Sequence, residues 1–453
     1  MIDLGQRQRI HVVGVGGAGM SAIAVVLKAM GHVVSGSDQR ESPVLERIAA
    51  AGVVTKVGHD AAEINGVDLV AISTAIRDDN PAVVAARAAG IAVVRRAEVL
   101  AAICAQRQTA AVAGTHGKTT TSSMLSLILV EAGWQPSFII GGEVNEIGGG
   151  AAWGGGEWFV VEADESDGTF LELPRKAAII TNVAPDHLEH YGGYDALRDA
   201  FARFARETDG PVVIGDAPDL AELTESAKNI VTVGLDSSSR YVIDNIVRER
   251  AMVRFVLRRG SREVGDFHVP TAGLHNARNA AVAAALALEL GVPVDAAQSA
   301  LGRFAGVARR FQFRGPRRGV DYVEDYAHLP EEVEAAIGAA RDGGWDRVVV
   351  VFQPHRYSRT QQLAADFAHA FDGADHVIVT DIYGSGEAPR PGVTGHLVVD
   401  AVRAARPDLG VTWLPGRTDL AAHLAGTMRP GELCLVLSAG DLTSLPDEVA
   451  AVP

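Results

Sequence analysis

The chain of 453 residues carries 41 Lys and Arg against 56 Asp and Glu, which gives a formal net charge of −15 at pH 7. This acidic balance excludes a protein that coats nucleic acid through bulk positive charge, so any polyanionic ligand has to be held locally. At roughly 150 residues per domain the length corresponds to two or three domains. An apolar fraction of 47% excludes a disordered chain.

The cysteine count and the apolar runs indicate the cellular compartment of the protein. Two cysteines, Cys104 and Cys434, exclude a disulfide framework and a cysteine-ligated zinc site, and they fit a reducing compartment. Residues 1–9 lack the apolar stretch of a secretory signal peptide. The longest apolar run, residues 280–288, is shorter than the ~20 residues that a membrane span needs. We therefore expect a soluble, cytoplasmic protein.

Short apolar runs alternate with longer helical patterns along the chain, which predicts an α/β fold built from βαβ units with parallel sheets. The first block has expected strands at 9–13, 32–35, 67–72 and 91–94, and expected helices at 21–30, 44–51 and 81–89. The second has strands at 109–113, 158–161, 177–182 and 212–214, a helix at 276–290, and inserted antiparallel strands within 240–269. The third has strands at 320–324, 347–352, 377–380, 411–414 and 433–437. This rhythm predicts three domains, at 1–105, 106–307 and 308–453.

Residues 14–19 form a G-x-G-x-x-G motif between the first expected strand and the first helix, and Asp38 ends the second strand. Glycines permit a tight turn and close backbone approach, while the helix N-terminus offers N–H groups to a diphosphate. The motif predicts nucleotide binding but does not decide between NAD and another nucleotide. An NAD-dependent oxidoreductase is therefore one hypothesis, although it leaves a second loop unexplained.

That second loop, residues 114–120 (GTHGKTT), directly follows a strand and precedes a helix. It is a P-loop variant, because the strict pattern requires glycine where the chain has Val112. In such a loop Lys118 reaches the β- and γ-phosphates and the Thr119 hydroxyl binds Mg²⁺. An ordinary glycine-rich turn is the alternative. The loop predicts an enzyme that uses ATP.

Acidic and histidine side chains at two strand ends supply candidate Mg²⁺ ligands. Residues 162–167 (EADESD) would by themselves fit a solvated loop, but beside a P-loop we expect Glu162 to bind Mg²⁺. His187 and His190 have the spacing of a zinc pair, yet the sequence offers no matching third ligand. We therefore expect His187 at a second Mg²⁺ ion and His190 at the surface.

Nine segments occur in one order along nearly the whole chain: 11–21 (HVVGVGGAGMS), 35–38 (SGSD), 95–98 (RRAE), 114–121 (GTHGKTTT), 162–167 (EADESD), 181–187 (TNVAPDH), 273–279 (GLHNARN), 309–311 (RRF) and 352–360 (FQPHRYSRT). This ordered set resembles the Mur ligases. The resemblance implies a Rossmann-like UDP-sugar-binding domain at 1–105, an ATP-binding central domain at 106–307 and a Rossmann-like, amino-acid-binding domain at 308–453.

The resemblance also implies the reaction. It predicts an ATP- and Mg²⁺-dependent ligase that joins L-alanine to the lactyl carboxylate of UDP-N-acetylmuramic acid through an acyl phosphate, an early cytoplasmic step of peptidoglycan synthesis. We expect neither nucleic acid nor membrane as a partner, and a monomer or weak homodimer. A non-catalytic sugar-nucleotide sensor is a third hypothesis, against which the intact P-loop speaks.

Residue roles follow from the resemblance, position by position. Gly16, Gly17, Ala18 and Gly19 would bind the UDP diphosphate, Asp38 the uridine and Ser166 the substrate. Gly114, Thr115, His116, Gly117, Lys118, Thr119 and Thr120 would bind the ATP phosphates, with Thr119, Glu162 and His187 at the metals. Asn276 and Asn279 would meet adenine, Asp325 the ribose and Arg310 the phosphates. Tyr326, His328, His355, Arg356 and Arg359 would line the L-alanine site. The expected catalytic set is Lys118, Glu162, His187, Arg310 and His328.

Independent chemistry supports one of these assignments, because Arg356 and Arg359 can pair a substrate carboxylate through charge-assisted hydrogen bonds. A surface salt-bridge cluster is the alternative for the same two residues. The chain has no lysine between Lys176 and Lys228, as expected of the branch of the family that adds L-alanine. Glu324, Leu329 and Ser438 depart from the family pattern. Glycine or L-serine therefore stays open as the amino acid substrate.

Overall fold

The computed structural model describes residues 2–452 except 74, 143, 187, 216–219, 221, 222, 224, 226, 228, 249–251 and 308. The described chain forms two compact units. The first comprises Met1–Asp244, Val256–Phe267 and Arg278–Gly302, and the second comprises Asn245–Phe255, His268–Ala277 and Arg303–Pro453. Three sheets organise these units, and the mixture of helices with mostly parallel strands confirms the expected α/β class.

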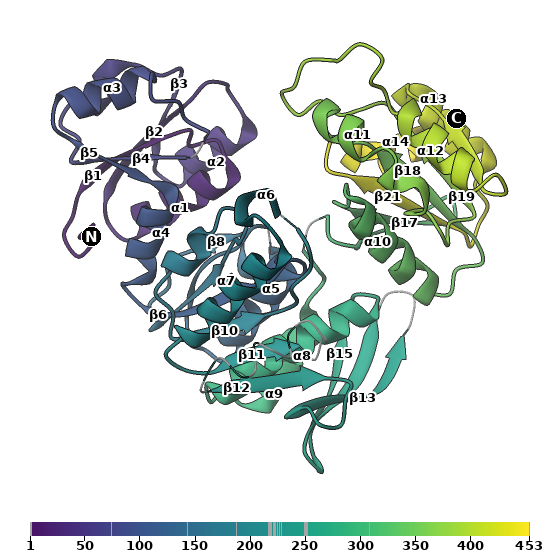
Figure 1. Ribbon diagram of the computed structural model, residues 1–453, viewed down its shortest axis with the longest axis horizontal. Coiled ribbons are helices and arrows are strands. Elements are labelled where there is room, and N and C mark those ends of the chain that lie inside the picture. Colours follow the sequence, from purple (N-terminus) through teal and green to yellow (C-terminus); the bar gives the residue numbers. More distant parts are fainter. Residues whose placement is uncertain are drawn as a thin grey trace. The chain divides into compact units, whose positions relative to one another are not determined.

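The first sheet is parallel and has the strand order β3-β2-β1-β4-β5 (Figure 1). Its strands are β1 (Arg9–Val13), β2 (Val33–Asp38), β3 (Val54–Val57), β4 (Leu69–Ile72) and β5 (Ala92–Arg95), and its helices are α1 (Ala18–Ala29), α2 (Pro43–Ala50), α3 (Pro81–Ala88) and α4 (Arg96–Cys104). The strand order reverses beside β1, which pairs with β2 on one side and β4 on the other. Ligands bind at such switch points, at the carboxyl ends of the strands.

The second sheet has ten strands in the order β15-β14-β13-β12-β11-β10-β6-β9-β7-β8. They are β6 (Gln108–Ala113), β7 (Ser137–Ile139), β8 (Ala151–Ala152), β9 (Trp158–Glu162), β10 (Ala177–Ile180), β11 (Val212–Gly215), β12 (Ile230–Gly234), β13 (Tyr241–Arg248), β14 (Val253–Arg259) and β15 (Arg262–Val269). The associated helices are α5 (Lys118–Glu131), α6 (Leu188–Tyr191), α7 (Tyr194–Arg206), α8 (Leu274–Glu289) and α9 (Val294–Arg303). In this sheet β6 lies between β10 and β9, so the loop that follows β6 emerges at the centre of the parallel part.

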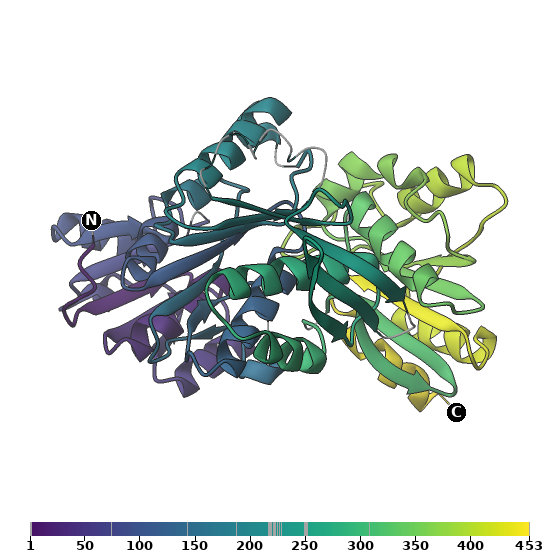
Figure 2. The ribbon, with the colours of Figure 1, turned by 90° about the horizontal axis from the view of Figure 1, so that it is seen from below.

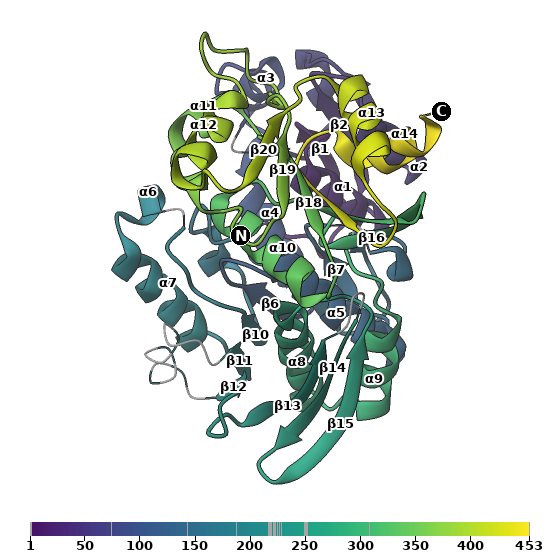
Figure 3. The same ribbon diagram turned by 90° about the vertical axis from the view of Figure 1, so that its right-hand side faces the viewer.

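The inserted strands expected within 240–269 are present as β13, β14 and β15 (Figure 3). Two residues, Gly260 and Ser261, connect β14 to β15, and only antiparallel neighbours can be joined by so short a connection. The sequence predicts a parallel sheet plus a small antiparallel sheet for this block, which the mixed sheet confirms. The inserted strands are joined to the parallel part, because β12 pairs with β13 in parallel through Val233 and Tyr241.

The third sheet has the order β16-β17-β21-β18-β19-β20. Its strands are β16 (Gln312–Arg317), β17 (Val320–Asp325), β18 (Val348–Gln353), β19 (His376–Val379), β20 (Gly410–Trp413) and β21 (Leu433–Ser438), and its helices are α10 (Pro330–Asp342), α11 (Tyr357–Leu363), α12 (His396–Ala405), α13 (Arg417–Thr427) and α14 (Leu445–Ala451). Helices α10 and α12 pack on one face, and α13 and α14 on the other. Figure 2 shows these two layers in green above the strands and in yellow below them.

The edge strand β16 is absent from the sequence prediction. It contains Gly315 and Pro316, which weaken strand propensity, and it pairs with β17 in antiparallel fashion with an irregularity between Phe313 and Gly315. Such residues are tolerated at a sheet edge because one side of the strand needs no ladder partner. Among the described helices, none is both long enough and apolar enough to cross a membrane.

Candidate active site

The glycine-rich loop leaves the carboxyl end of β1 and leads into α1. Gly14 adopts a left-handed backbone with φ +77°, and its N–H donates to Ser37 O at 2.8 Å. The N–H of Gly16 donates to the Asp38 carboxylate at 2.9 Å. Asp38 thus lies directly against the loop that is expected to bind a nucleotide, and Gly17 precedes the first turn of α1. The loop and the acidic residue, far apart in sequence, therefore form one local site.

The P-loop between β6 and α5 requires glycine at two positions. Gly114 has φ +132°, and a Cβ there would lie 2.0 Å from Thr181 Oγ1. Gly117 has φ +80°, and a Cβ there would lie 2.7 Å from Asn279 Oδ1. Left-handed φ and close neighbours both exclude a larger side chain. The second contact places Asn279, an expected nucleotide residue on α8, beside the loop.

The end of the neighbouring strand β10 holds the P-loop backbone in place. Asn182 Oδ1 accepts from the His116 N–H at 3.0 Å, while Asn182 Nδ2 and Thr181 Oγ1 donate to His116 O at 2.9 and 2.5 Å. The Thr115 hydroxyl accepts from the Ala184 N–H at 2.9 Å. These bonds fix the loop before any ligand binds. Sequence reasoning assigned no role to Thr181 or Asn182, although both lie in a segment that carried the family resemblance.

Lys118 begins α5 and is enclosed by acceptors. Its ammonium donates to Gly114 O at 2.7 Å, to Thr115 O at 3.1 Å and to Glu165 Oε1 at 2.9 Å. The Glu165 side chain is 2% exposed. Burial raises the pKa of Glu165, while the nearby Lys118 charge opposes that rise. Sequence reasoning did not single out Glu165, and its position within the acidic run after β9 was the available signal.

The two expected Mg²⁺ ligands with described positions lie together. Thr119 Oγ1 donates to Glu162 Oε1 at 3.0 Å, and Glu162 Oε2 accepts from the Gly141 N–H at 2.7 Å. A hydroxyl and a carboxylate are hard oxygen donors of the kind that Mg²⁺ takes while keeping waters and substrate phosphates. Within the described residues no group of three His, Cys, Asp or Glu side chains could hold a metal alone. The donor set therefore fits Mg²⁺ bound together with nucleotide phosphates. His187 lies outside the described residues.

The acidic run after β9 also lies near the first glycine-rich loop. The N–H of Ser166, an expected substrate residue, donates to Asp164 Oδ1 at 3.0 Å. Arg96, at the start of α4, has its guanidinium 3.8 Å from Asp164 and 3.9 Å from Asp167. The same guanidinium lies 3.1 Å from the position of a Cβ on Gly19. Arg96 thus lies beside both the glycine-rich loop and the acidic run.

The second unit holds the remaining expected residues. Asp325, at the end of β17, accepts from the N–H groups of Phe311 and Ala327, each at 2.7 Å, and burial raises the pKa of its carboxyl to about 6. Asn276 donates to Ala272 O at 2.7 Å. The Arg310 guanidinium carbon lies 5.5 Å from the centre of the Tyr326 ring. Asp325 therefore secures the backbone on both sides of the Arg310–Tyr326 contact.

Aromatic and cationic side chains gather at the carboxyl ends of β17 and β18. The rings of Tyr326 and His328 are 5.6 Å apart, and those of His328 and His355 are 5.5 Å apart. Arg359 and His355 share a hydrogen bond of 3.0 Å at His355 Nδ1. Burial, then the neighbouring His328 and Arg359, lower the pKa of His355 to about 4, so its Nδ1 accepts from the guanidinium. Arg356 is exposed, with a left-handed φ of +69°.

Comparison with known proteins identifies the family. Three family models match the chain: "Mur ligase family, catalytic domain" at residues 9–108, "Mur ligase middle domain" at 112–287 and "Mur ligase, glutamate ligase domain" at 309–440. The chain belongs to the Mur ligase family. As a Mur ligase it is an enzyme of peptidoglycan synthesis, which confirms the resemblance stated from the motifs.

Named relatives cover nearly the whole of this Mur ligase. It is 43% identical to the UDP-N-acetylmuramate–L-alanine ligase of an Anaeromyxobacter species (strain Fw109-5), over 97% of each chain. It is also 43% identical to the enzyme of the same name from Myxococcus xanthus, over 97% of this chain and 94% of the relative. The crystal structure of UDP-N-acetylmuramate–alanine ligase from Thermotoga maritima matches with a TM-score of 0.83 and 29% identity, over 98% of each chain.

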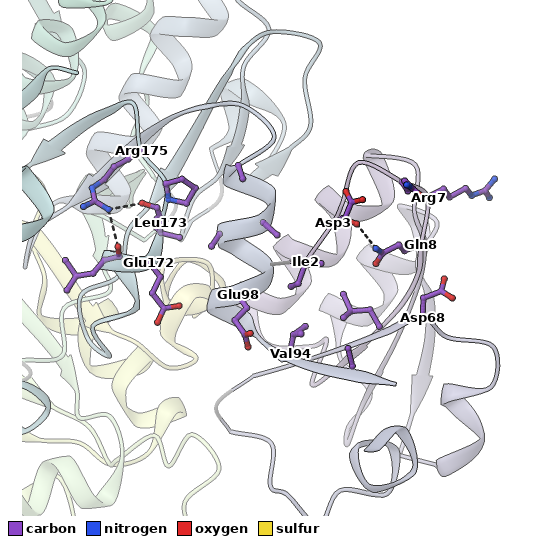
Figure 4. Close-up of a pocket in the computed structure, with 18 of the residues that line it drawn as sticks. Ile2, Asp3, Arg7, Gln8, Asp68, Val94, Glu98, Glu172, Leu173 and Arg175 are labelled. Atoms are coloured by element: carbon purple, nitrogen blue, oxygen red, sulfur yellow. Dashed lines mark hydrogen bonds between the residues drawn. The ribbon is translucent and has the colours of Figure 1, made fainter. Parts of the chain in front are cut away.

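Two cavities complete the description of the ligase. One of about 240 Å³ lies at the carboxyl ends of β18, β19 and β21, and its lining includes Gln353, Tyr383 and Asp441. The Tyr383 ring stacks on the His355 ring, with 5.9 Å between the ring centres. A second, more open cavity of about 1290 Å³ lies in the first unit (Figure 4). Its lining carries the carboxylates Asp3, Asp68, Glu98, Glu172, Glu207 and Asp209, which outnumber the lining cations Arg7 and Arg175. Because polyphosphates are repelled by such a lining, we do not expect the nucleotide there.

Proposed function

We propose that this Mur ligase joins L-alanine to UDP-N-acetylmuramic acid in the cytoplasm, with hydrolysis of ATP to ADP and phosphate. Two observations together support this proposal. The P-loop is preorganised, with Lys118 and the Thr119–Glu162 oxygen pair in place, and the chain is similar over its full length to enzymes named for this reaction. The sugar-nucleotide sensor hypothesis gives no reason for that catalytic arrangement, and an NAD-dependent oxidoreductase gives none for the P-loop.

In the first step of the proposed reaction, an oxygen of the lactyl carboxylate attacks the γ-phosphorus of ATP. The bond between that phosphorus and the bridging oxygen breaks, and ADP leaves with an acyl phosphate remaining. Lys118 and Arg310 would stabilise the negative charge on the transferring phosphoryl group. Mg²⁺ held by Thr119 and Glu162, with His187 at a second ion, would neutralise charge on the phosphate oxygens.

In the second step the amine nitrogen of L-alanine attacks the acyl carbon. The tetrahedral intermediate collapses with loss of phosphate and of an amine proton, which leaves the amide. Arg356 and Arg359 would pair the carboxylate of alanine, and Tyr326, His328 and His355 would surround its amine and methyl group. His328 is the proposed catalytic residue of this step. Exclusion of water would protect the acyl phosphate from hydrolysis.

Substrate and nucleotide positions follow from the two loops. Gly16, Gly17, Ala18 and Gly19 would bind the UDP diphosphate through backbone N–H groups, with Asp38 at the uridine and Ser166 at the sugar substrate. Residues 114–120 would bind the ATP phosphates, Asn276 and Asn279 the adenine and Asp325 the ribose.

The proposed domains are 1–105, 106–307 and 308–453, which the extents of the three family models support. We propose a monomer or weak homodimer without nucleic acid or membrane partners.

A coupled phosphate-release assay tests the proposal and its amino acid. We expect ATP hydrolysis only when UDP-N-acetylmuramic acid and the amino acid are both present, with a higher kcat/KM for L-alanine than for glycine or L-serine in parallel reactions. Because Glu324 and Leu329 depart from the family pattern, the three amino acids need direct comparison. Phosphate release that does not depend on the sugar nucleotide would contradict the proposal, and a preference for glycine or L-serine would correct the substrate.

A further inference from the structure

The carboxylate of Glu324 is buried in β17 and satisfied by three donors. The residue is 1% exposed. Its Oε1 accepts from Arg309 Nε at 3.1 Å and from Thr443 Oγ1 at 2.7 Å, and its Oε2 accepts from Arg314 Nη1 at 2.6 Å. Charge-assisted bonds of this kind hold planar guanidinium groups in fixed orientations. Glu324 therefore helps to hold both arginine side chains in place.

The two arginines lead to different parts of the second unit. Arg314 belongs to the edge strand β16, so its bond to Glu324 secures the β16–β17 pair. Arg309 lies beside the expected amino acid site. Its Nη2 donates to Ser438 O at 2.5 Å and to Gly440 O at 3.0 Å, and its guanidinium carbon lies 4.8 Å from the centre of the Tyr326 ring. Arg309 is thus the one of the pair that connects Glu324 to Tyr326.

The backbone around Arg309 is strained and held by neighbouring groups. Arg309 and Phe311 have left-handed φ angles of +62° and +43°, which residues other than glycine adopt only at a cost in conformational free energy. The Tyr326 N–H donates to Arg309 O at 2.7 Å, and the Phe311 N–H donates to the Asp325 carboxylate at 2.7 Å. This strained turn presents Arg310, whose guanidinium also faces the Tyr326 ring.

We propose that Glu324 is a positioning residue of the active site. By fixing the Arg309 guanidinium, it holds the Tyr326 ring and the turn that presents Arg310. Glu324 itself has no place in the proposed chemistry, because the residue is 1% exposed and both of its carboxylate oxygens accept from protein donors. The inference rests on the proposed function, which gives Tyr326 and Arg310 their roles toward amino acid and phosphate.

A matched pair of variants separates positioning from stability. Arg309→Gln and Arg314→Gln each remove one guanidinium from the same buried carboxylate. We expect Arg309→Gln to lower kcat at least tenfold and to raise the KM for L-alanine, because Tyr326 and Arg310 lose their orientation. We expect Arg314→Gln to lower the thermal midpoint with kcat and KM within threefold of wild type. Glu324→Gln, which removes the charge but keeps the shape, should reproduce the kinetic loss of Arg309→Gln.

A readout other than activity completes the test. Hydrogen exchange at the Tyr326 and Phe311 amides should accelerate in Arg309→Gln and remain as in wild type in Arg314→Gln. If Arg309→Gln does not fold, Arg309→Lys, which keeps the charge but not the planar fork, should show the same exchange and a smaller kinetic loss. Equal kinetic losses and equal amide exchange in Arg309→Gln and Arg314→Gln would overturn the inference. If the wild type itself releases no substrate-dependent phosphate, the proposed function fails, whereas the exchange comparison still decides the inference.

Discussion

Replacing Gly114 by alanine tests the described geometry of the P-loop, and Gly133→Ala is its matched control. Gly114 lies before α5 and Gly133 after it, and both have positive φ, +132° and +75°. A Cβ on Gly133 meets nothing within 4 Å, whereas a Cβ on Gly114 would lie 2.0 Å from Thr181 Oγ1 and 2.9 Å from Asn182 O. The control therefore has a positive φ without the overlap.

The structure sets the expected magnitudes. A left-handed backbone costs a residue with a Cβ roughly 1–2 kcal/mol, so Gly133→Ala should destabilise the protein by about that amount and leave ATP affinity unchanged. Gly114 has a φ of +132°, further from any conformation open to alanine, which costs about 1–3 kcal/mol, and the overlap adds about 1–3 kcal/mol, for a total of about 2–6 kcal/mol in Gly114→Ala. Displacing Thr181 and Asn182 also shifts the loop that they hold, and a displacement of about 1 Å at a catalytic site can reduce the rate ~100-fold.

The assays are urea denaturation for stability, calorimetric titration with ATP for binding and phosphate release for the rate. We expect Gly114→Ala to lower both the denaturation midpoint and ATP affinity, and Gly133→Ala to lower the midpoint alone. If Gly114→Ala binds ATP as tightly as wild type, residues 114–120 do not form the nucleotide site and the reasoning is refuted. Equal effects of the two substitutions would refute the described contact with Thr181.

Three further predictions concern single side chains. Glu162→Gln should raise the Mg²⁺ concentration for half-maximal activity at least ~10-fold, since ligand-shell changes typically cost that much, and an unchanged Mg²⁺ dependence would contradict the assignment. Glu165→Gln should lower the thermal midpoint more without ATP than with saturating ATP, because phosphates would replace the carboxylate as the anionic partner of Lys118; an equal loss in both conditions would argue against that exchange. Burial lowers the pKa of His355 to about 4, below its unfolded value, so its contribution to stability should fall by about 2 kcal/mol, after a discount for solvent screening, as pH falls from about 6.5 to about 4; because Asp325 titrates in the same window with the opposite sign, the difference in unfolding free energy between wild type and His355→Gln in urea denaturation at each pH isolates this contribution.

Much of the architecture could be predicted from the sequence because its signals are local. Apolar runs such as residues 9–13 and 109–113 became buried central strands, and glycine motifs between strand and helix became loops with left-handed glycines. Strand β16 could not be predicted, because Gly315 and Pro316 oppose a strand and only pairing with β17 stabilises it. The parallel pairing of β13 with β12 likewise could not be predicted, because a connection as short as residues 235–240 ordinarily joins antiparallel strands.

The residues of the candidate site could be predicted from the sequence, but which of their side chains contact one another could not. Lys118, Thr119 and Glu162 could be proposed from the motifs, and the structure shows the last two in contact. The pairing of Lys118 with Glu165 could not be deduced, because four carboxylates occur within residues 162–167 and spacing alone does not say which one faces the loop. Glu324 appeared only as a departure from the family pattern, and its three bonds join residues up to 119 positions apart.

In the proposed mechanism the γ-phosphoryl group of ATP is transferred to the lactyl carboxylate, and the resulting acyl phosphate forms before the amine attacks. Isotope transfer tests it most directly, with UDP-N-acetylmuramic acid carrying ¹⁸O in both lactyl carboxylate oxygens. Since the carboxylate oxygen that attacks phosphorus leaves with the phosphate, mass spectrometry of the released phosphate should find a single ¹⁸O per molecule. Phosphate without ¹⁸O, formed in step with the amide product, would contradict the account.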